Sequence, residues 1–329
     1  EFRRVLFRSG AYMEKNRYRR LRKTIVAVSV ILTLLLAAPF SETAYQNVGA
    51  VYAEEATDLP RFSDVEGAAD YLRQKLVERE TNISFIFCDE DISGCDSREN
   101  LETDINARAA NVWKSILGEA RSHTGDPKEG DYLFNSIDYL RYGITTTYVP
   151  GQDSSGLLAK NIQYSFVLEI SYYTTSEQEA AVEARVNEVL SSLNISGMTD
   201  YEKVSEIYDY IIKNVSYDYE HLNDDNYLLK QSAYAALING TSVCQGYASL
   251  FYYMALKAGL DSRIVTGVAS SDGSDATEFH AWNIVKIDGK YYSVDSTWDS
   301  AYPECIYFLK GTGDFINHGT DATSYVEEG

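Results

Sequence analysis

The sequence predicts an α+β protein in which a helix-and-sheet C-terminal domain follows a smaller α/β domain. Three observations carry this prediction. Hydrophobic residues make up 45% of the 329 residues, which is enough to bury a core. Capping boxes at Ser63–Glu66 and Thr199–Glu202 open stretches with helical spacing of apolar residues. Runs rich in Thr, Tyr, Phe and Ile alternate as strands do, and two of them are joined by Asp288-Gly289, a strong hairpin signal.

The first 53 residues read as a leader rather than as part of the fold. After Met13 come a basic stretch, an apolar run from Ile25 to Ala38, and small residues that end at Ala53. That order is typical of a secretory signal peptide, here residues 13–53, cleaved after Ala53. The apolar run is shorter than the roughly 18 residues of a spanning helix, so a retained anchor is the weaker alternative. We expect a secreted or cell-envelope protein that meets the membrane only transiently.

The charge balance excludes some partners. The chain has 29 Lys and Arg against 49 Asp and Glu, a net charge of −20. Nucleic-acid binding needs a basic surface, so no nucleic acid is expected as a partner. The four cysteines show no paired metal-ligand spacing, and we expect neither a metal nor a cofactor. After export Cys88 and Cys95 could form a disulfide or stay free, which leaves Cys305 over.

Residues 54–195 are expected to form the N-terminal α/β domain, whose function the sequence does not indicate. The boundary is placed where Asn194–Met198 breaks the preceding helix. The predicted elements in chain order are a helix at Ser63–Arg79, a strand at Asn82–Cys88, a helix at Asp104–Ala120, strands at Ile144–Val149 and Ile162–Tyr173, and a helix at Ser176–Leu193.

Residues 196–329 are expected to form the C-terminal domain. No terminator precedes Gly329, so a truncation of this domain at its C-terminus stays open. The predicted elements are an amphipathic helix from Thr199 to about Ile212, a short helix at Ser232–Ile238, a helix at Val243–Lys257, and strands at Arg263–Val268, Phe279–Ile287 and Lys290–Val294.

Cys244 is the first candidate for chemistry, because it stands where the helix after Gly240-Thr241-Ser242 begins. The free N–H groups and positive dipole end of a helix N-terminus stabilise a thiolate. Gly246 lacks a side chain, so a backbone or a substrate can approach near the sulfur. The competing interpretation is a small buried apolar residue.

His280 and Asp295 supply a base and an orienting acid. If Asp288-Gly289 is a two-residue loop, the numbers of paired residues sum to 577, and His280 opposes Thr297 while Trp282 opposes Asp295. His280 and Asp295 then share one face of the hairpin as diagonal neighbours. A register slip of one residue would place them on opposite faces. The alternative for Asp295 is a local turn at the strand end.

Three blocks of the sequence resemble the Cys, His and Asp blocks of the transglutaminase-like superfamily, and the resemblance spans about residues 199–310. They are Thr241-Ser242-Val243-Cys244-Gln245-Gly246-Tyr247-Ala248, Phe279-His280-Ala281-Trp282-Asn283, and Tyr292-Ser293-Val294-Asp295-Ser296-Thr297-Trp298-Asp299. The resemblance implies a papain-like domain, with a Cys-bearing helix packed on an antiparallel sheet that bears His and Asp. It also implies a catalytic triad of Cys244, His280 and Asp295.

The function implied by this resemblance is thiol-dependent acyl transfer on peptide or glutamine-type amide bonds of proteins or peptides, including cell-wall or surface proteins. In transglutaminases proper, a Trp upstream of the Cys helps to stabilise the oxyanion, but this chain has no Trp between Trp113 and Trp282. A peptidase or amidase is therefore favoured over a cross-linking enzyme. The further oxyanion or cleft candidates are Tyr217, Tyr219, Gln245, Trp282 and Trp298.

A second function class stays open beside the enzyme. The same scaffold can serve a non-catalytic cell-envelope protein that binds wall or protein ligands, because fold does not fix function. The presence of all three triad residues in the expected order favours the enzyme.

Overall fold

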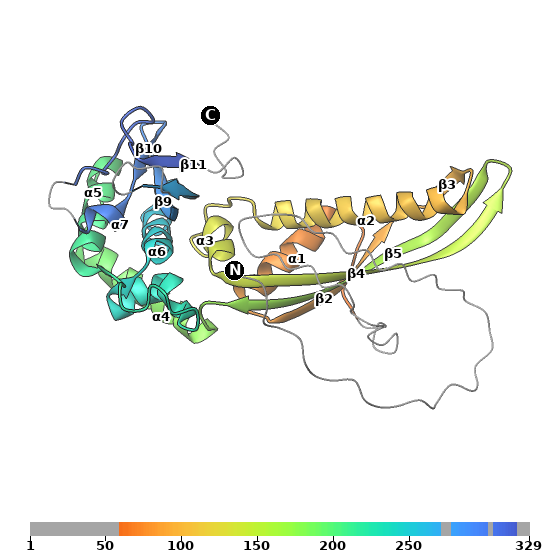
Figure 1. Ribbon diagram of the computed structural model, residues 1–329, viewed down its shortest axis with the longest axis horizontal. Coiled ribbons are helices and arrows are strands. Elements are labelled where there is room, and N and C mark those ends of the chain that lie inside the picture. Colours follow the sequence, from red (N-terminus) through yellow and green to blue (C-terminus); the bar gives the residue numbers. More distant parts are fainter. Residues whose placement is uncertain (1–58, 271–277, 302–304, 321–329) are drawn as a thin grey trace, which may run out of the picture.

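The computed structural model describes residues 59–270, 278–301 and 305–320. A long curved sheet with helices along one face occupies one part of the molecule, and a compact bundle of helices around a second sheet occupies the other (Figure 1). The expected leader with its cleavage site at Ala53 lies outside the described residues, as does the chain end at Gly329. Among the described residues, no helix combines the length and the apolar composition that crossing a bilayer requires.

The N-terminal part is built on a five-stranded sheet. Its pairings run in the order β1-β2-β5-β3, and β4 also pairs with β5, along the length of that strand. Only β1 and β2 pair in parallel, and the other pairs are antiparallel. Its elements are β1 (Arg61–Phe62), α1 (Val65–Val77), β2 (Asn82–Asp89), β3 (Ile92–Cys95), α2 (Arg98–Ala120), α3 (Gly130–Asn135), β4 (Ile137–Asp153) and β5 (Gly156–Tyr172).

This part is an antiparallel α+β unit rather than the α/β unit that the sequence suggested. The two strands expected at 144–149 and 162–173 are segments of one hairpin, whose strands have 17 residues each. The expected capping box at Ser63–Glu66 is replaced by Asp64, whose carboxylate accepts from the Gly67 N–H at 2.7 Å. Helix α2 begins before the expected Asp104 because the Ser97 hydroxyl caps it.

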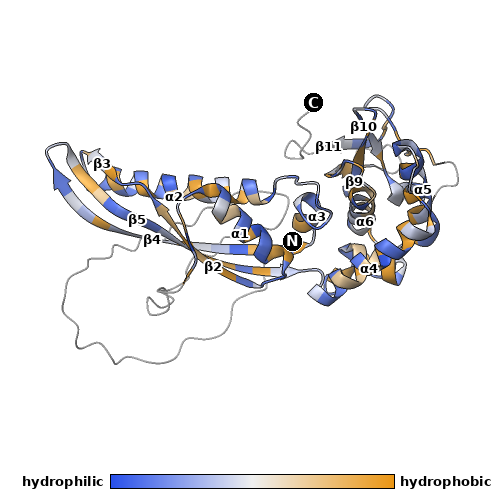
Figure 2. Ribbon diagram, turned by 180° about the vertical axis from the view of Figure 1, so that it is seen from behind, coloured by the Kyte–Doolittle hydropathy of each residue, from blue (hydrophilic) through white to orange (hydrophobic). Residues whose placement is uncertain are grey.

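Helices α1 and α2 cover one face of this sheet with aromatic contacts at the centre. Phe166 stacks on Phe85 at 5.0 Å between ring centroids and on Trp113 at 5.5 Å. Hydrophobic and hydrophilic stretches alternate along the long strands (Figure 2), as expected for a sheet with one covered face. The sheet therefore has its own core, separate from that of the compact part.

Of the two states left open for Cys88 and Cys95, a disulfide or free thiols, the structure has the free thiols. Cys88 pairs with Gln163 of β5, whereas Cys95 pairs with Leu157 on the same strand. Six residues of extended chain separate these partners by about 20 Å. A disulfide needs Cα atoms within about 7 Å, so strand pairing keeps these two cysteines apart.

The compact part is built around helix α6 and a four-stranded antiparallel sheet of order β10-β9-β8-β11. Where a short helix was expected at 232–238, the structure has a single π-helical turn at Ala235–Asn239, and a 3₁₀ turn at Leu228–Gln231 precedes it. The elements are α4 (Ser176–Ser192), α5 (Asp200–Asn214), β6 (Ser216–Tyr217), η1 (Leu228–Gln231), η2 (Ala235–Asn239), β7 (Thr241–Ser242), α6 (Cys244–Lys257), β8 (Ser262–Ala269), β9 (Glu278–Ile287), β10 (Lys290–Val294), α7 (Ser296–Asp299) and β11 (His318–Thr320).

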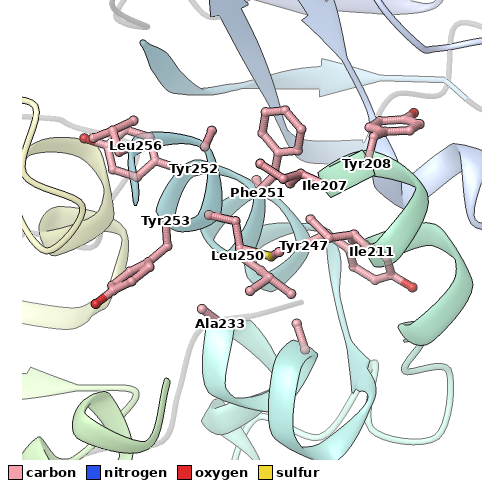
Figure 3. Close-up of a cluster of buried hydrophobic side chains, with 14 of the residues drawn as sticks. Ile207, Tyr208, Ile211, Ala233, Tyr247, Leu250, Phe251, Tyr252, Tyr253 and Leu256 are labelled. Carbon is pink, nitrogen blue, oxygen red and sulfur yellow. The ribbon is translucent and has the colours of Figure 1, made fainter. Parts of the chain in front are cut away.

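Helix α6 is the centre of this core, and its residues from Gly246 to Leu256 are all buried. Figure 3 shows Tyr247, Leu250 and Phe251 of α6 among the side chains of α5. Helix α4 joins the same core through Val182, Val186, Val189 and Leu190. Apart from Tyr132 of α3, the buried residues of this core all follow β5 in the chain, so α4 packs with the residues after the boundary predicted at residues 195 and 196.

Polar contacts join the two parts of the molecule. The Asp131 carboxylate, on α3, accepts from Arg263 of β8 through two bonds of 2.7 and 2.9 Å, and from the Ile264 N–H at 2.9 Å. His123 Nδ1 lies 3.2 Å from the hydroxyl of Tyr252 on α6. These bonds attach the sheet domain directly to the helix and the sheet that carry the candidate site.

Candidate active site

Cys244 is the first residue of α6, as the sequence predicted, and the preceding Val243 is the N-cap. Gly246 allows this helix start to pack tightly against the loop before it. A Cβ at Gly246 would overlap the Ser242 hydroxyl and come within 2.6 Å of the Ser232 carbonyl oxygen. The thiol is therefore held at a helix N-terminus whose first N–H groups have no intrahelical acceptor.

The hairpin that carries His280 has the predicted register. Partners from Lys290 with Ile287 to Val294 with Asn283 all sum to 577, and Asp288 and Gly289 have φ of 49° and 80°, as a two-residue turn requires. The ladder stops at Val294, so His280 has no strand partner at Thr297. Instead α7 begins at Ser296.

Asp295 leaves the strand and points its carboxylate at the histidine. His280 Nε2 lies 2.8 Å from Asp295 Oδ2. The other carboxylate oxygen accepts from the N–H groups of Thr297 and Trp298 at 2.9 and 3.2 Å, and thereby caps α7. Asp295 thus makes both the contact with His280 that an orienting acid needs and the turn contacts at the strand end, so the two interpretations do not exclude each other. The Tyr208 hydroxyl donates to the Asp295 carbonyl oxygen at 2.8 Å, which anchors this turn to α5.

The electrostatics of the three residues are coupled. Burial alone would lower the pKa of His280, but the charge and hydrogen bond of Asp295, together with a side-chain hydrogen bond to Cys244, raise it to about 10. Burial alone would raise the pKa of Asp295, but the charge and hydrogen bond of His280 hold it well below its usual range. His280 and Asp295 are therefore joined by a direct hydrogen bond, and Cys244 interacts with the same imidazole.

Both tryptophan candidates, Trp282 and Trp298, lie against the imidazole of His280. The Trp298 ring stacks on it at 5.1 Å between centroids, and the Trp282 ring lies 6.0 Å away at an interplanar angle of 25°. Trp282 also packs with Val265 and Ile284 in a small apolar cluster. Both rings restrict the orientation of His280.

Tyr217 lies near the thiol, and Gln245 does not join the site. The pKa of the Tyr217 hydroxyl is raised mainly by burial. The charges of Cys244 and Glu278 raise it further. Tyr219 contacts the Tyr217 ring at 4.9 Å and is 74% exposed. The Gln245 amide instead donates to the Asn135 carbonyl at 2.6 Å, a bond between the two parts of the molecule. As an oxyanion candidate, Gln245 is therefore corrected to a structural residue.

His318 is a site residue that the sequence reasoning missed. Its Nε2 lies 3.1 Å from Asp295 Oδ2, the same oxygen that faces His280. The one available signal was that the chain has only four histidines. The ligand atoms of His280, Asp295 and His318 lie within 4.8 Å of one another, a spacing that a divalent cation could also use. We assign no metal here, because these atoms already serve the hydrogen bonds of the triad.

Comparison with known proteins gives the class of the compact part. The transglutaminase-like superfamily model matches residues 188–296, which include the Cys, His and Asp blocks. The molecule therefore carries a domain of the transglutaminase-like superfamily, and its α+β fold agrees with this assignment.

Two curated relatives match different shares of this chain. Kyphoscoliosis peptidase of Mus musculus is 33% identical over 132 residues, which cover 38% of this chain and 20% of that protein. Kyphoscoliosis peptidase of Homo sapiens is 29% identical over 328 residues, which cover 91% of this chain and 46% of that protein. The chain thus spans less than half the length of these curated relatives. A solved structure described as a TGase shares 16% identity at a TM-score of 0.31, covering 72% of this chain and 59% of that one.

Proposed function

We propose that this protein is a thiol-dependent acyl-transfer enzyme that acts on peptide or glutamine-type amide bonds. The observation that carries the proposal is that the His280 imidazole interacts with both Asp295 and Cys244, with the cysteine at a helix N-terminus. A nucleophile, a base and a group that orients the base are the minimum set for covalent acyl transfer.

The reaction follows from the positions of these groups. The Cys244 thiolate attacks the amide carbonyl carbon, and the N–H groups at the start of α6 stabilise the resulting oxyanion. The His280 imidazolium then donates its proton to the leaving amine, the C–N bond breaks, and a thioester remains. Neutral His280 next removes a proton from water or an amine, which attacks the thioester and releases the Cys244 thiolate. Asp295 keeps the imidazole in the required orientation throughout.

Hydrolysis is the preferred outcome within this proposal. The chain lacks a Trp between Trp113 and Trp282, the region where transglutaminases proper place an oxyanion Trp. The curated relatives are named peptidases, which agrees with this preference. Tyr217 is our candidate for the residue that replaces this Trp, because Cys244 is close enough to contribute to its raised pKa. We further propose an extracytoplasmic location, supported by the signal-like order of residues 13–53.

The test separates the two acceptors. The mature protein is incubated with casein alone and with casein plus dansylcadaverine, and new N-termini, released ammonia and incorporated dye are measured. We expect peptide or amide cleavage that exceeds dye incorporation and disappears in Cys244→Ala. Cys88→Ser is the matched control, because it changes a free, half-buried thiol in the other part of the molecule. Dye incorporation without cleavage would overturn the hydrolytic preference. Absence of both, with an unreactive Cys244, would favour the non-catalytic binding protein.

A further inference from the structure

The oxygen of Asp295 that faces His280 has a second imidazole beside it. His318 Nε2 lies 3.1 Å from Asp295 Oδ2, and His280 Nε2 lies 2.8 Å from the same atom. The His318 side chain is only 1% exposed, so water cannot replace this contact. The triad of Cys244, His280 and Asp295 requires one histidine beside the carboxylate, and the structure has two.

The other ring nitrogen of His318 shows how the ring is protonated. His318 Nδ1 lies 2.9 Å from the Ile316 carbonyl oxygen, which can only accept a hydrogen bond. Both ring nitrogens therefore face acceptors. Either neutral tautomer would place a nitrogen lone pair against an oxygen in a buried position, which is costly. Donation from both nitrogens satisfies both contacts and makes the ring an imidazolium.

The surroundings suit a buried cation. The ring of Phe315 stacks on His318 at 4.0 Å between centroids, and the Trp298 ring lies 4.4 Å away. Aromatic faces attract cations, most strongly where water is excluded. The ionisable side chains that face His318 are Asp295 at the start of α7, His280 on β9, and Tyr307 at 5.4 Å between ring centroids. Among these described groups, Asp295 is the carboxylate that balances the positive charge of a doubly protonated His318.

Strand β11 is built to bring His318 to this place. It pairs with β8 through His318 with Ala269 and Thr320 with Gly267. A Cβ on Gly267 would overlap the Gly319 carbonyl oxygen and come within 2.8 Å of the Trp282 ring. Because Gly267 has none, β11 can pair closely with β8, and from β11 the His318 side chain contacts Asp295.

We propose that His318 is a positioning residue that, as an imidazolium, holds the Asp295 carboxylate in the orientation His280 needs. This inference rests on the proposed function, because it names the residue that keeps the triad aligned. His318 fixes Oδ2 while the N–H groups of Thr297 and Trp298 fix Oδ1, so the carboxylate cannot rotate away from His280. The positive charge of His318 also offsets part of the pull of Asp295 on the His280 proton, which eases its transfer to a leaving amine.

Two variants separate the hydrogen bond from the packing. His318→Phe keeps an aromatic ring in the cage but removes both donors. His318→Gln keeps an N–H that can reach Asp295 and removes the ring. Iodoacetamide alkylation of Cys244 at pH 7 is followed by mass spectrometry, with folding checked by circular dichroism. We expect His318→Phe to slow alkylation about tenfold and His318→Gln to stay within about threefold of wild type. Wild-type rates in His318→Phe would overturn the proposal, as would a loss in His318→Gln alone.

The controls use His123, a histidine that contacts α6 through Tyr252. His123 also faces an acidic group, with Nε2 3.2 Å from Asp261, but it lies outside the triad. His123→Phe and His123→Gln should leave the alkylation rate unchanged. If both slow it as much as His318→Phe does, the effect of His318 is general destabilisation and the positioning role is rejected.

A second readout does not depend on catalysis. The chain has four histidines, so the ring nitrogens of ¹⁵N-labelled protein can be assigned by comparison with His318→Gln. At pH 7 we expect both His318 nitrogens to carry a proton. A lone-pair nitrogen in His318 would overturn the inference even if the enzyme is active. Conversely, two protonated nitrogens in a protein with an unreactive Cys244 would reject the proposed function and leave the His318 to Asp295 contact established.

Discussion

His280 and Asp295 form a buried pair, with Nε2 and Oδ2 2.8 Å apart and side chains 7% and 1% exposed. The pair joins the end of a hairpin to the first turn of α7, and its other side faces the thiol at the start of α6. Three separate elements therefore meet at the His280 imidazole. In such a cluster, each residue changes the chemistry of the next.

The first prediction concerns Asp295→Asn. Asparagine keeps an oxygen that can cap α7, but it cannot balance the buried imidazolium of His280, so the melting temperature should fall along with the activity. We expect kcat/KM on a peptide substrate to fall by about 10³ to 10⁴, as for carboxylate removal in a related triad. Steady-state kinetics beside a thermal melt measures both quantities. Retention of more than a tenth of the activity would argue against Asp295 as the orienting acid.

The pKa shifts predict how stability depends on pH. The pKa of His280 is raised to about 10, so its contribution is complete below its unfolded value of about 6.5 and is lost as pH rises through 10. The pKa of Asp295 is lowered, so its contribution is present above about 4 and is lost on further acidification. We expect maximal stability between about pH 4 and 6.5 from this pair.

The measurement for this prediction is the melting temperature at pH 6 and pH 9. Wild type should lose several degrees over this interval, and His280→Gln should lose less, because glutamine has no proton to release. An equal loss in both proteins would show that the alkaline destabilisation arises elsewhere.

Gly246→Ala tests the tight contact under the catalytic helix. A Cβ there would overlap the Ser242 hydroxyl and approach the Ser232 carbonyl, so we expect destabilisation by about 2 kcal/mol or more. Gly118→Ala is the matched control. Gly118 lies inside α2 with no atom within 4 Å of an added Cβ, so alanine should stabilise that helix by about 0.5 to 1 kcal/mol. Urea unfolding reports both values, and similar changes in the two variants would contradict the packing argument.

Gln245→Ala distinguishes a structural from a catalytic role for the neighbour of Cys244. The amide bonds the Asn135 carbonyl, so its removal should cost about 1 kcal/mol of stability. We expect kcat to stay within about twofold of wild type, since removing a true oxyanion donor costs about a hundredfold or more. A hundredfold loss of kcat at unchanged stability would restore Gln245 as an oxyanion donor.

Local sequence signals predicted the elements that carry the triad. The Asp288-Gly289 turn set the hairpin register up to Val294, and Asp295 follows directly after that ladder and reaches His280. The capping box at Thr199 begins α5 as expected, with the Thr199 hydroxyl accepting from Glu202 and the Glu202 carboxylate accepting from the Thr199 N–H. Such signals depend on neighbours in the chain, so a single sequence is enough to interpret them.

What the sequence did not predict depends on tertiary contacts. His318 comes well after α7 in the chain, and the pairing of β11 with β8 brings it to Asp295. The side chain of Gln245 follows the catalytic residue, yet its direction is set by Asn135, more than a hundred residues earlier. Helix α4 has a regular capping signal, but nothing local shows that it packs against α6 rather than the sheet domain.

The most direct test of the account is the rate of iodoacetamide alkylation at Cys244 from pH 5 to 10, measured in wild type and in His280→Ala with Cys305 replaced in both. Since alkylation requires the thiolate, and His280 stabilises the thiolate as its ion-pair partner, we expect fast alkylation of wild type already at pH 6. His280→Ala should react at that pH at least about tenfold more slowly and recover only in alkali. Equal rates in the two proteins across the range would contradict an activated Cys244 and His280 pair.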